Sequence, residues 1–150
     1  MASPCDSKAA SVPSDTARRQ AERFKRVRDA HQTEIAEDYV ELIADLIEEL
    51  GEARVVDLAA RLGVSSATVN NTVQRLMRDG LVTTKPYRSI FLTPEGQAVA
   101  ATSRERHQTV RDFLIALGVP AEIAEADAEG IEHHVSAETL EVFRRHVAAR

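Results

Sequence analysis

Two short amphipathic segments joined by a tight turn, residues 54–81, constrain the fold of this 150-residue chain more than any other feature. The first segment ends at Gly63, and Ser65 or Ser66 is placed to cap the second, which Gly80 terminates. In the second segment apolar side chains recur at helical spacing and are expected to face inward, at Val69, Val73 and Leu76. The pattern predicts a helix-turn-helix.

The opposite face of the second helix is polar or basic and carries no acidic residue before Asp79. Side chains of these kinds exchange hydrogen bonds with base edges and phosphates. The alternative is a helical hairpin whose surface is merely polar. We expect DNA contacts from seven residues of this region: Ser65, Ser66, Thr68, Asn70, Asn71, Gln74 and Arg75.

The segment that follows favours DNA binding. Residues 81–84 and 89–92 have strand character and flank a tight connection that holds two basic residues, Lys85 and Arg88. A recognition helix followed by a basic hairpin is the winged-helix arrangement, so Lys85 and Arg88 complete the predicted DNA contacts. The net charge of the chain is −5, but residues 65–95 are basic, and the sum therefore does not argue against nucleic acid.

Helical patterns surround this region. A basic segment that begins near Asp15 is followed by an apolar helical pattern over residues 33–50, which Gly51 stops. The basic segment is most simply a solvated helix face, and an additional DNA contact is the alternative. Residues 1–14 are small and polar, and we expect them to be disordered.

The C-terminal part is predicted to be entirely helical. Thr93 is placed to cap a long helix that runs to about Leu117, Pro120 opens a second helix, and Ser136 caps a third. Their apolar faces exceed what one winged helix could cover, and the last helix alone contributes Leu140, Phe143 and Val147. We expect these faces to be buried by homodimerisation.

We therefore expect a mainly α chain of three parts. A tail, residues 1–14, precedes a winged helix-turn-helix domain with a small β-hairpin wing, residues 15–95, and a helical dimerisation domain, residues 96–150. No run of residues approaches the length of a membrane span, and the N-terminus lacks the apolar stretch of a secretion signal. The only cysteine is Cys5. We expect a cytoplasmic protein without membrane contact, whose partners are double-stranded DNA and a second copy of the chain.

A second candidate site lies in residues 129–134, with the sequence EGIEHH. On a helix, Glu129, Glu132 and His133 would project from one face. They would form a ligand set of oxygen and nitrogen that suits Mn²⁺, Fe²⁺ or Zn²⁺. The alternative is a solvated acidic face, because further acids precede them on the same arc.

Other residues of these types have ordinary explanations when taken singly. Asp38 and Glu41 form an acidic pair at i and i+3, and such a pair usually belongs to a solvent-exposed helix face. His107 lies at the edge of an apolar face, where a histidine is more often a packing residue than a metal ligand. His134 falls on the apolar arc, where packing is expected rather than metal ligation. Gly130 suggests either a close backbone approach or a local break in the helix.

Together these residues make the sequence similar to the manganese-responsive regulators of the diphtheria toxin repressor family. The resemblance extends from about Glu37 to Phe143 and rests most on five segments: 37–41 (EDYVE), 59–64 (AARLGV), 92–96 (LTPEG), 106–107 (RH) and 127–134 (DAEGIEHH). In that family a winged helix is joined to a helical dimerisation domain, and a two-metal site forms between them.

The resemblance implies the metal and its ligands. The implied cofactor is Mn(II), two ions per subunit in a binuclear site, held by Asp38, Glu41, His107, Glu129, Glu132 and His133. Iron-responsive relatives have methionine where Asp38 stands, and the harder carboxylate favours Mn²⁺. One departure concerns Asn70 and Asn71, where relatives often have a lysine, so the operator sequence does not carry over.

The implied function is repression of manganese-uptake genes when Mn(II) is abundant, without enzymatic activity and without an organic small-molecule substrate. Three alternatives stay open. The first is a repressor of the same family that responds to iron or another divalent metal, and the second is a regulator that senses an organic ligand. The third is a dinuclear metalloenzyme, which is disfavoured because no further nucleophile or acid–base group lies near the ligand motifs.

Overall fold

The computed structural model describes residues 14–85 and 89–150, and over these residues the fold is mainly helical, as predicted. The elements in chain order are α1 (Asp15–Leu50), β1 (Ala53–Arg54), α2 (Val55–Leu62), α3 (Ser66–Arg78), β2 (Val82–Thr84), β3 (Ser89–Leu92), α4 (Pro94–Ala116), α5 (Ala121–Ile131), the 3₁₀ helix η1 (Glu132–His134) and α6 (Ala137–Ala148). The predicted tail, apart from Ser14, and the predicted DNA contact Arg88 lie outside the described residues.

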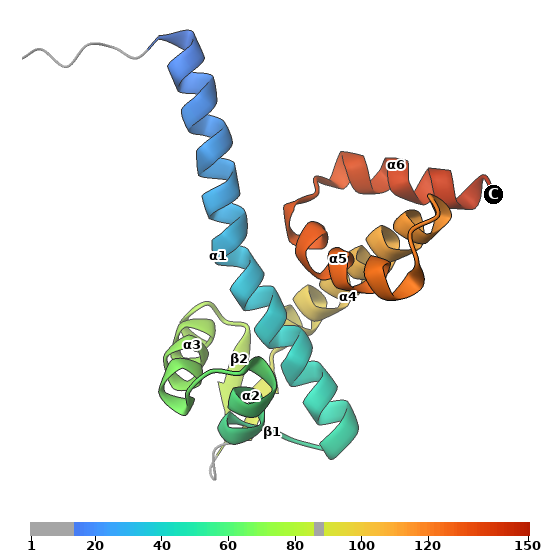
Figure 1. The fold of residues 1–150 in the computed structure, drawn as a ribbon. Helices are drawn as coiled ribbons and strands as arrows, with labels where there is room; N and C mark the ends of the chain where they lie inside the picture. The colour runs from blue at the N-terminus through green and yellow to red at the C-terminus, as the bar shows by residue number, and fades with distance from the viewer. Residues whose placement is uncertain (1–13, 86–88) are drawn as a thin grey trace, which may run out of the picture.

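The first helix, α1, is one continuous helix of 36 residues, in which the basic segment and the apolar pattern follow each other without a break. The hydroxyl of Ser14 accepts a hydrogen bond from the backbone N–H of Ala17 and caps the helix. No glycine or proline interrupts residues 15–50, and Gly51, at φ 80°, ends the helix in the left-handed conformation. Figure 1 shows the first half of α1 projecting from the rest of the molecule, and residues 15–29 are exposed.

The predicted helix-turn-helix is formed by α2 and α3, which pack against the second half of α1 (Figure 1). The Ser65 hydroxyl accepts a hydrogen bond from the Thr68 N–H and caps α3. The strands form an antiparallel sheet in the order β1-β3-β2. This unit shares one core, which contains Tyr39, Ile43, Leu46, Ala53, Leu58, Val69, Val73, Leu76, Val82 and Ile90. The strand β1 was not predicted, because two residues are too few to show a periodic pattern.

Helix α4 begins in close contact with the winged helix. Thr93 caps it, accepting a hydrogen bond from the Gly96 N–H and donating one to the Gly80 carbonyl. A Cβ on Gly96 would lie 2.0 Å from the carbonyl oxygen of Leu81, so only glycine fits there. A Cβ on Gly130 would meet nothing within 4 Å. Of the two alternatives for Gly130, the close backbone approach is therefore wrong, and such an approach occurs at Gly96 instead. The other alternative, a local break, agrees with the end of the α-helix at Ile131 and the 3₁₀ turn that follows.

The C-terminal helices pack around a second, smaller core of Val110, Ala128 and Leu140. The rings of Phe113 and Phe143 stack beside it with their centroids 3.9 Å apart. Leu140 and Phe143 thus stabilise the fold of the single chain, and the expectation that they form the dimer contact is not supported. Leu117, which caps the C-terminal end of α4, is 56% exposed.

Among the residues that the structure describes, no helix combines the length and the apolar character that a membrane span requires.

Candidate metal centre

Three parts of the fold meet where the predicted metal ligands lie. Asp38 and Glu41 come from the middle of α1, His107 comes from α4, and the remaining ligands come from the end of α5 and from η1. The α-helix ends at Ile131 and continues as one 3₁₀ turn, in which successive residues advance by about 120° rather than 100°.

This change of pitch separates the three C-terminal ligands. The side chains of Glu132 and His133 are each 2% exposed, whereas that of Glu129 is 66% exposed. His133 lies against α1, where it contacts Glu37 and Asp38, and the shared face of the three C-terminal ligands stays a prediction. Glu129 and Glu132 both still approach His107.

The imidazole of His107 lies among three carboxylates. Its Nδ1 is 2.8 Å from Glu132 Oε2 and 3.6 Å from Glu129 Oε1, and its Nε2 is 2.8 Å from Glu125 Oε1. The Glu125 contact is a hydrogen bond. Single atoms of His107, Glu125 and Glu129 lie within 4.8 Å of one another, which makes this the first group of potential metal ligands.

The imidazole of His133 forms the centre of a second group. Its Nδ1 is hydrogen-bonded to Glu37 Oε2 at 2.5 Å, and its Nε2 lies 3.2 Å from Asp38 Oδ1 and 3.4 Å from Glu132 Oε1. Donor atoms of Glu34, Asp38 and His133 also lie within 4.8 Å of one another. Glu132 stands between the two groups, since one of its oxygens faces each imidazole.

Three buried polar atoms of this cluster have no hydrogen-bond partner among the described residues. One is Arg106 Nε, an N–H donor that cannot bind a metal ion, and the other two are the potential ligand atoms Glu132 Oε2 and His133 Nε2. Each is close to a neighbouring ionisable group, but neither is aligned with it for a hydrogen bond. A buried polar atom without a partner is costly. A metal ion would satisfy both, so the geometry fits the metal site that the sequence implies.

The charges of the centre are strongly perturbed. Burial raises the pKa of the Glu132 carboxyl to about 7, against the lowering influence of the His107 imidazole. Burial alone would lower the pKa of His133, but the carboxylates of Asp38 and Glu37 raise it to about 10. Burial also raises the pKa of Glu41, with the Glu129 and Asp38 carboxylates adding to the effect, while its hydrogen bond from Ser103 opposes it. Negative charge is therefore crowded here, and protons relieve part of it.

Glu41 does not contact either imidazole directly. It lines an open groove of about 580 Å³ together with Asp38 and Glu129. The groove also contains Glu34 and Asp45, so its wall is mainly acidic and attracts cations.

Four side chains that support this cluster were not predicted. Glu37 holds His133, Ser103 holds Glu41, and Glu125 holds His107. Arg106 donates a hydrogen bond to the backbone carbonyl of Glu132, and its Nη1 lies 3.7 Å from Glu37 Oε1. Glu37 and Arg106 adjoin predicted ligands in sequence, but adjacency alone gives no indication of these contacts.

The predicted DNA-contacting residues of the helix-turn-helix are all exposed, and they lie at the start of α3 and along its outer face. Lys85 at the base of the wing is exposed as well, and its Nζ lies 4.8 Å from the centre of the Phe91 ring. In Figure 1, α3 lies on the opposite side of α1 from α5 and α6. The candidate DNA surface and the C-terminal helices are therefore separate, and α1 connects them.

Two family matches together span most of the chain. Residues 31–90 match the family described as iron dependent repressor, N-terminal DNA binding domain. Residues 93–148 match the family described as iron dependent repressor, metal binding and dimerisation domain.

The chain is also similar to proteins named as MntR transcriptional regulators. It is 59% identical to the one from Escherichia coli O6:H1 over 123 residues, which are 82% of this chain and 79% of the relative. It is 43% identical to the one from Geobacillus kaustophilus over 100 residues, which are 67% of this chain and 71% of the relative.

Solved structures of similar fold include a manganese-dependent transcriptional repressor in complex with manganese, with a TM-score of 0.68 and 27% identity over 77% of this chain and 53% of that one. The manganese regulator SloR gives a TM-score of 0.67 and 27% identity over 77% of this chain and 54% of that one. The chain spans about half the length of these two proteins. By these matches the chain belongs to the iron-dependent repressor family, also called the diphtheria toxin repressor family, and within it groups with the MntR transcriptional regulators.

Proposed function

We propose that this protein is a Mn(II)-dependent, DNA-binding transcriptional repressor that acts as a homodimer. The observation that carries the proposal is the pair of buried, unpartnered atoms, Glu132 Oε2 and His133 Nε2, at the junction of α1, α4 and η1. The similarity to MntR regulators and to a manganese-dependent repressor supports the choice of metal and activity.

The proposed ligands are Asp38, Glu41, His107, Glu129, Glu132 and His133. Four carboxylates and two imidazoles, without sulfur, make a hard donor set of the kind that suits Mn²⁺. Glu37, Glu125 and Arg106 contact these ligands from behind and fix their orientation, as supporting residues do in metal sites.

Two ions per subunit are the stoichiometry that the side-chain positions favour. The donors divide into a group around His107 and a group around His133, and Glu132 directs one oxygen toward each. A carboxylate in that position would supply one oxygen to each group of donors. Glu41 and Glu129, at the mouth of the groove, can complete the coordination of either ion.

We propose that helix α1 couples metal binding to the position of the recognition helix α3. Asp38 and Glu41 lie on the same helix as Tyr39, Ile43 and Leu46, which are buried in the core of the winged helix. Without metal, Asp38 and Glu41 of α1 face Glu129 and Glu132, and the negative charge that the protons on Glu132 and His133 do not offset opposes the approach of the two parts. Bound Mn²⁺ supplies the positive charge that neutralises these carboxylates. The side chains then hold α1, and with it α3, in a fixed position relative to the dimerisation helices.

Fixing α3 matters because a dimer must present two recognition helices to successive major grooves, about 34–36 Å apart. Restricting their relative motion in advance lowers the entropic cost of binding DNA. We assign base and phosphate contacts to Ser65, Ser66, Thr68, Asn70, Asn71, Gln74, Arg75, Lys85 and Arg88. Because the partner is chromosomal DNA, the protein would act in the cytoplasm, and repression of manganese-uptake genes is the expected outcome.

The test is binding to fragments of genomic DNA during titration with Mn²⁺, followed by a chelator. We expect a shifted complex that requires Mn²⁺ and that disappears when the metal is removed. Binding that is independent of any metal would contradict the proposal and favour a regulator of organic ligands. The absence of any DNA complex, together with metal-dependent hydrolysis, would favour the metalloenzyme.

Arg75→Ala identifies the DNA surface in the same assay. Loss of one phosphate contact should reduce the slope of log affinity against log salt by roughly 0.9. The matched control is Arg145→Ala, since Arg145 is an exposed arginine of α6. An unaltered slope in Arg75→Ala would exclude this face of α3 as the interface.

A further inference from the structure

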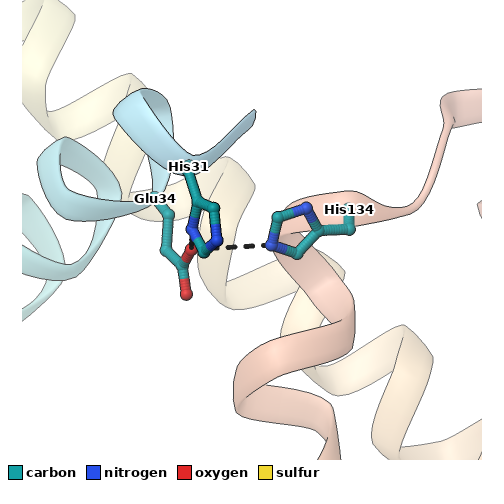
Figure 2. Close-up of side chains that lie close together, drawn as sticks. All are labelled: His31, Glu34 and His134. Carbon is teal, nitrogen blue, oxygen red and sulfur yellow. Dashed lines mark hydrogen bonds and ion pairs between the residues drawn. The ribbon is translucent and has the colours of Figure 1, made fainter. Parts of the chain in front are cut away.

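A further cluster of potential metal ligands lies beside the candidate centre. It shares Glu34 with the group around His133 and contains none of the six proposed manganese ligands. It consists of His31 and Glu34 from α1 and His134 from η1. Figure 2 shows the two imidazole rings and the carboxylate pointing toward one another across the gap between the two segments. One atom from each side chain lies within 4.8 Å of the other two.

The two imidazoles approach the same carboxylate oxygen of Glu34. His31 Nδ1 lies 2.8 Å from Glu34 Oε2, and His134 Nε2 lies 3.5 Å from the same atom (Figure 2). The two rings meet edge to face, with centroids 5.3 Å apart. The sequence predicted that His134 would pack on an apolar face, and this is wrong, because a third of its side chain is exposed and it faces Glu34.

An ordinary polar contact would account for only part of this arrangement. His31 and Glu34 are spaced i, i+3, and such pairs occur on many exposed helices. His134, however, comes from a distant part of the sequence, and its nitrogen approaches the oxygen that His31 already uses. Two imidazole nitrogens and one carboxylate oxygen from two segments are the protein ligands of a common type of zinc site, in which water takes the remaining position.

The composition of the cluster differs from that of the main centre. Two of its three donors are nitrogen, whereas four of the six proposed manganese ligands are carboxylates. Imidazole suits Zn²⁺ and other late first-row ions, which also bind nitrogen donors more tightly than Mn²⁺ does. His31 is 68% exposed at its side chain, so an ion can enter from solvent.

We propose that His31, Glu34 and His134 bind a third divalent cation, of the Zn²⁺ type, at a site distinct from the manganese centre. The ion would connect α1 to η1 at the point where α1 first meets the rest of the molecule, since residues 15–29 are exposed. It would therefore cross-link α1 to the segment that carries Glu132 and His133.

The experiment measures bound zinc per subunit in the full-length protein by equilibrium dialysis and metal analysis. We expect His31→Ala and His134→Ala each to bind one zinc ion per subunit fewer than the wild type. The controls are Gln32→Ala, an exposed neighbour on α1, and His146→Ala, a histidine that contacts Phe113 instead. Both controls should bind as much zinc as the wild type.

Co²⁺ provides a spectroscopic readout at the same site. Visible absorption bands of low-symmetry Co²⁺ should appear in the wild type and weaken in His31→Ala. Mn²⁺-dependent DNA binding by His31→Ala should stay unchanged, so that failure of this proposal and failure of the proposed function can be told apart. Equal zinc binding by wild type and His31→Ala would overturn the third site. So would a loss in His134→Ala alone, because His134 adjoins the proposed ligand His133.

Discussion

Glu132 is the residue on which the two halves of the candidate centre meet. Its buried carboxylate lies between the imidazoles of His107 and His133, and burial raises its pKa to about 7. A carboxyl group in this state carries a proton part of the time at neutral pH. Binding of a cation must displace that proton and also the proton of His133, so metal affinity and pH are linked.

The stability of the metal-free protein should fall as pH rises from about 5 to about 10. The folded-state pKa values of Glu132 and His133, about 7 and about 10, are raised above the unfolded values of 4.5 and 6.5. A raised pKa contributes stability that is complete below the unfolded value and is lost as pH passes the folded value. The contribution of Glu132 is therefore lost first and that of His133 later. Thermal unfolding at several pH values measures the decline.

Mn²⁺ should reverse this trend, because deprotonated ligands bind the metal more tightly. The gap in Tm between the manganese-loaded and metal-free protein should widen by several degrees over the same pH range. In Glu132→Gln the widening should be reduced, whereas Glu138→Gln, an exposed acid of α6, should behave as the wild type. A gap that narrows with rising pH would contradict the proposed ligands.

Asp38 is the residue that should set the choice of metal. Its side chain is 43% exposed, so Asp38→Met can be accommodated without repacking the core. The anionic oxygen that favours Mn²⁺ is replaced by a neutral, softer sulfur, which suits Fe²⁺ or Co²⁺ better. We expect the variant to need about tenfold more Mn²⁺, or a larger excess, for DNA binding, while its Co²⁺ response falls less.

Anaerobic DNA-binding titrations with Mn²⁺, Fe²⁺ and Co²⁺ at fixed protein concentration measure the selectivity of Asp38→Met. Circular dichroism of the metal-free variant should first match that of the wild type. An equal loss for all three metals would mean that Asp38 sets affinity without selecting the ion.

Among the secondary-structure elements, the junction of the wing with α4 depends on the absence of a side chain at Gly96. A methyl group there would collide with the carbonyl of Leu81, which also accepts a hydrogen bond from the Thr93 N–H. Gly96→Ala should therefore lower the free energy of unfolding by about 1–3 kcal/mol or more. Gly130→Ala is the matched control, because it meets nothing within 4 Å and should gain up to about 1 kcal/mol. Urea unfolding compares the two, and equal effects would refute the close contact.

The C-terminal helices should form the dimer through side chains that the single chain leaves exposed. These are Ile115, Leu117, Ile123, Ile131 and Val142. Leu117→Asp or Ile123→Asp should shift a dimer toward monomer in sedimentation experiments, because an unpaired charge is costly in an apolar contact. Val56→Asp, at an equally exposed position of α2, should leave the dimer intact. Leu140→Asp should unfold the chain instead, since Leu140 is buried in its core.

A wild-type protein that sediments as a monomer at micromolar concentration would contradict the proposed dimer. Normal dimerisation of both Leu117→Asp and Ile123→Asp would place the interface elsewhere.

Local signals predicted most of the elements. The capping residues Ser65 and Thr93 predicted the starts of α3 and α4, and both capping hydrogen bonds are present. The apolar spacing of α3 likewise predicted which of its residues are buried. Such features depend on interactions within a few residues, so the sequence around them is sufficient.

The arrangement of the candidate centre depends on contacts between distant segments, and here the sequence was less informative. Arg106 reaches the carbonyl of Glu132 across 26 residues, and Glu37 reaches His133 across 96. The 3₁₀ turn that carries the buried Glu132 and His133 is not indicated by the i, i+3, i+4 spacing. The helical spacing of apolar residues in α6 placed Leu140 on an apolar face. It could not show that this face packs against Val110 and Ala128 of the same chain.

At the scale of the whole molecule, α1 belongs to two structures at once. Its residues Tyr39, Ile43 and Leu46 are part of the winged-helix core, and its residues Asp38 and Glu41 face the metal centre. A change in the electrostatics of the centre must therefore alter the freedom of α3, which is the proposed coupling between metal and DNA.

The most direct test of this coupling is to measure two affinities in pairs: that for DNA with and without Mn²⁺, and that for Mn²⁺ with and without DNA. Thermodynamic linkage requires the two ratios to be equal, and a typical coupling of about 1–3 kcal/mol corresponds to roughly 5–150-fold. We predict equal ratios in this range for the wild type and ratios near one for Glu132→Gln. A wild-type ratio of one would contradict the account, because metal and DNA would then bind independently.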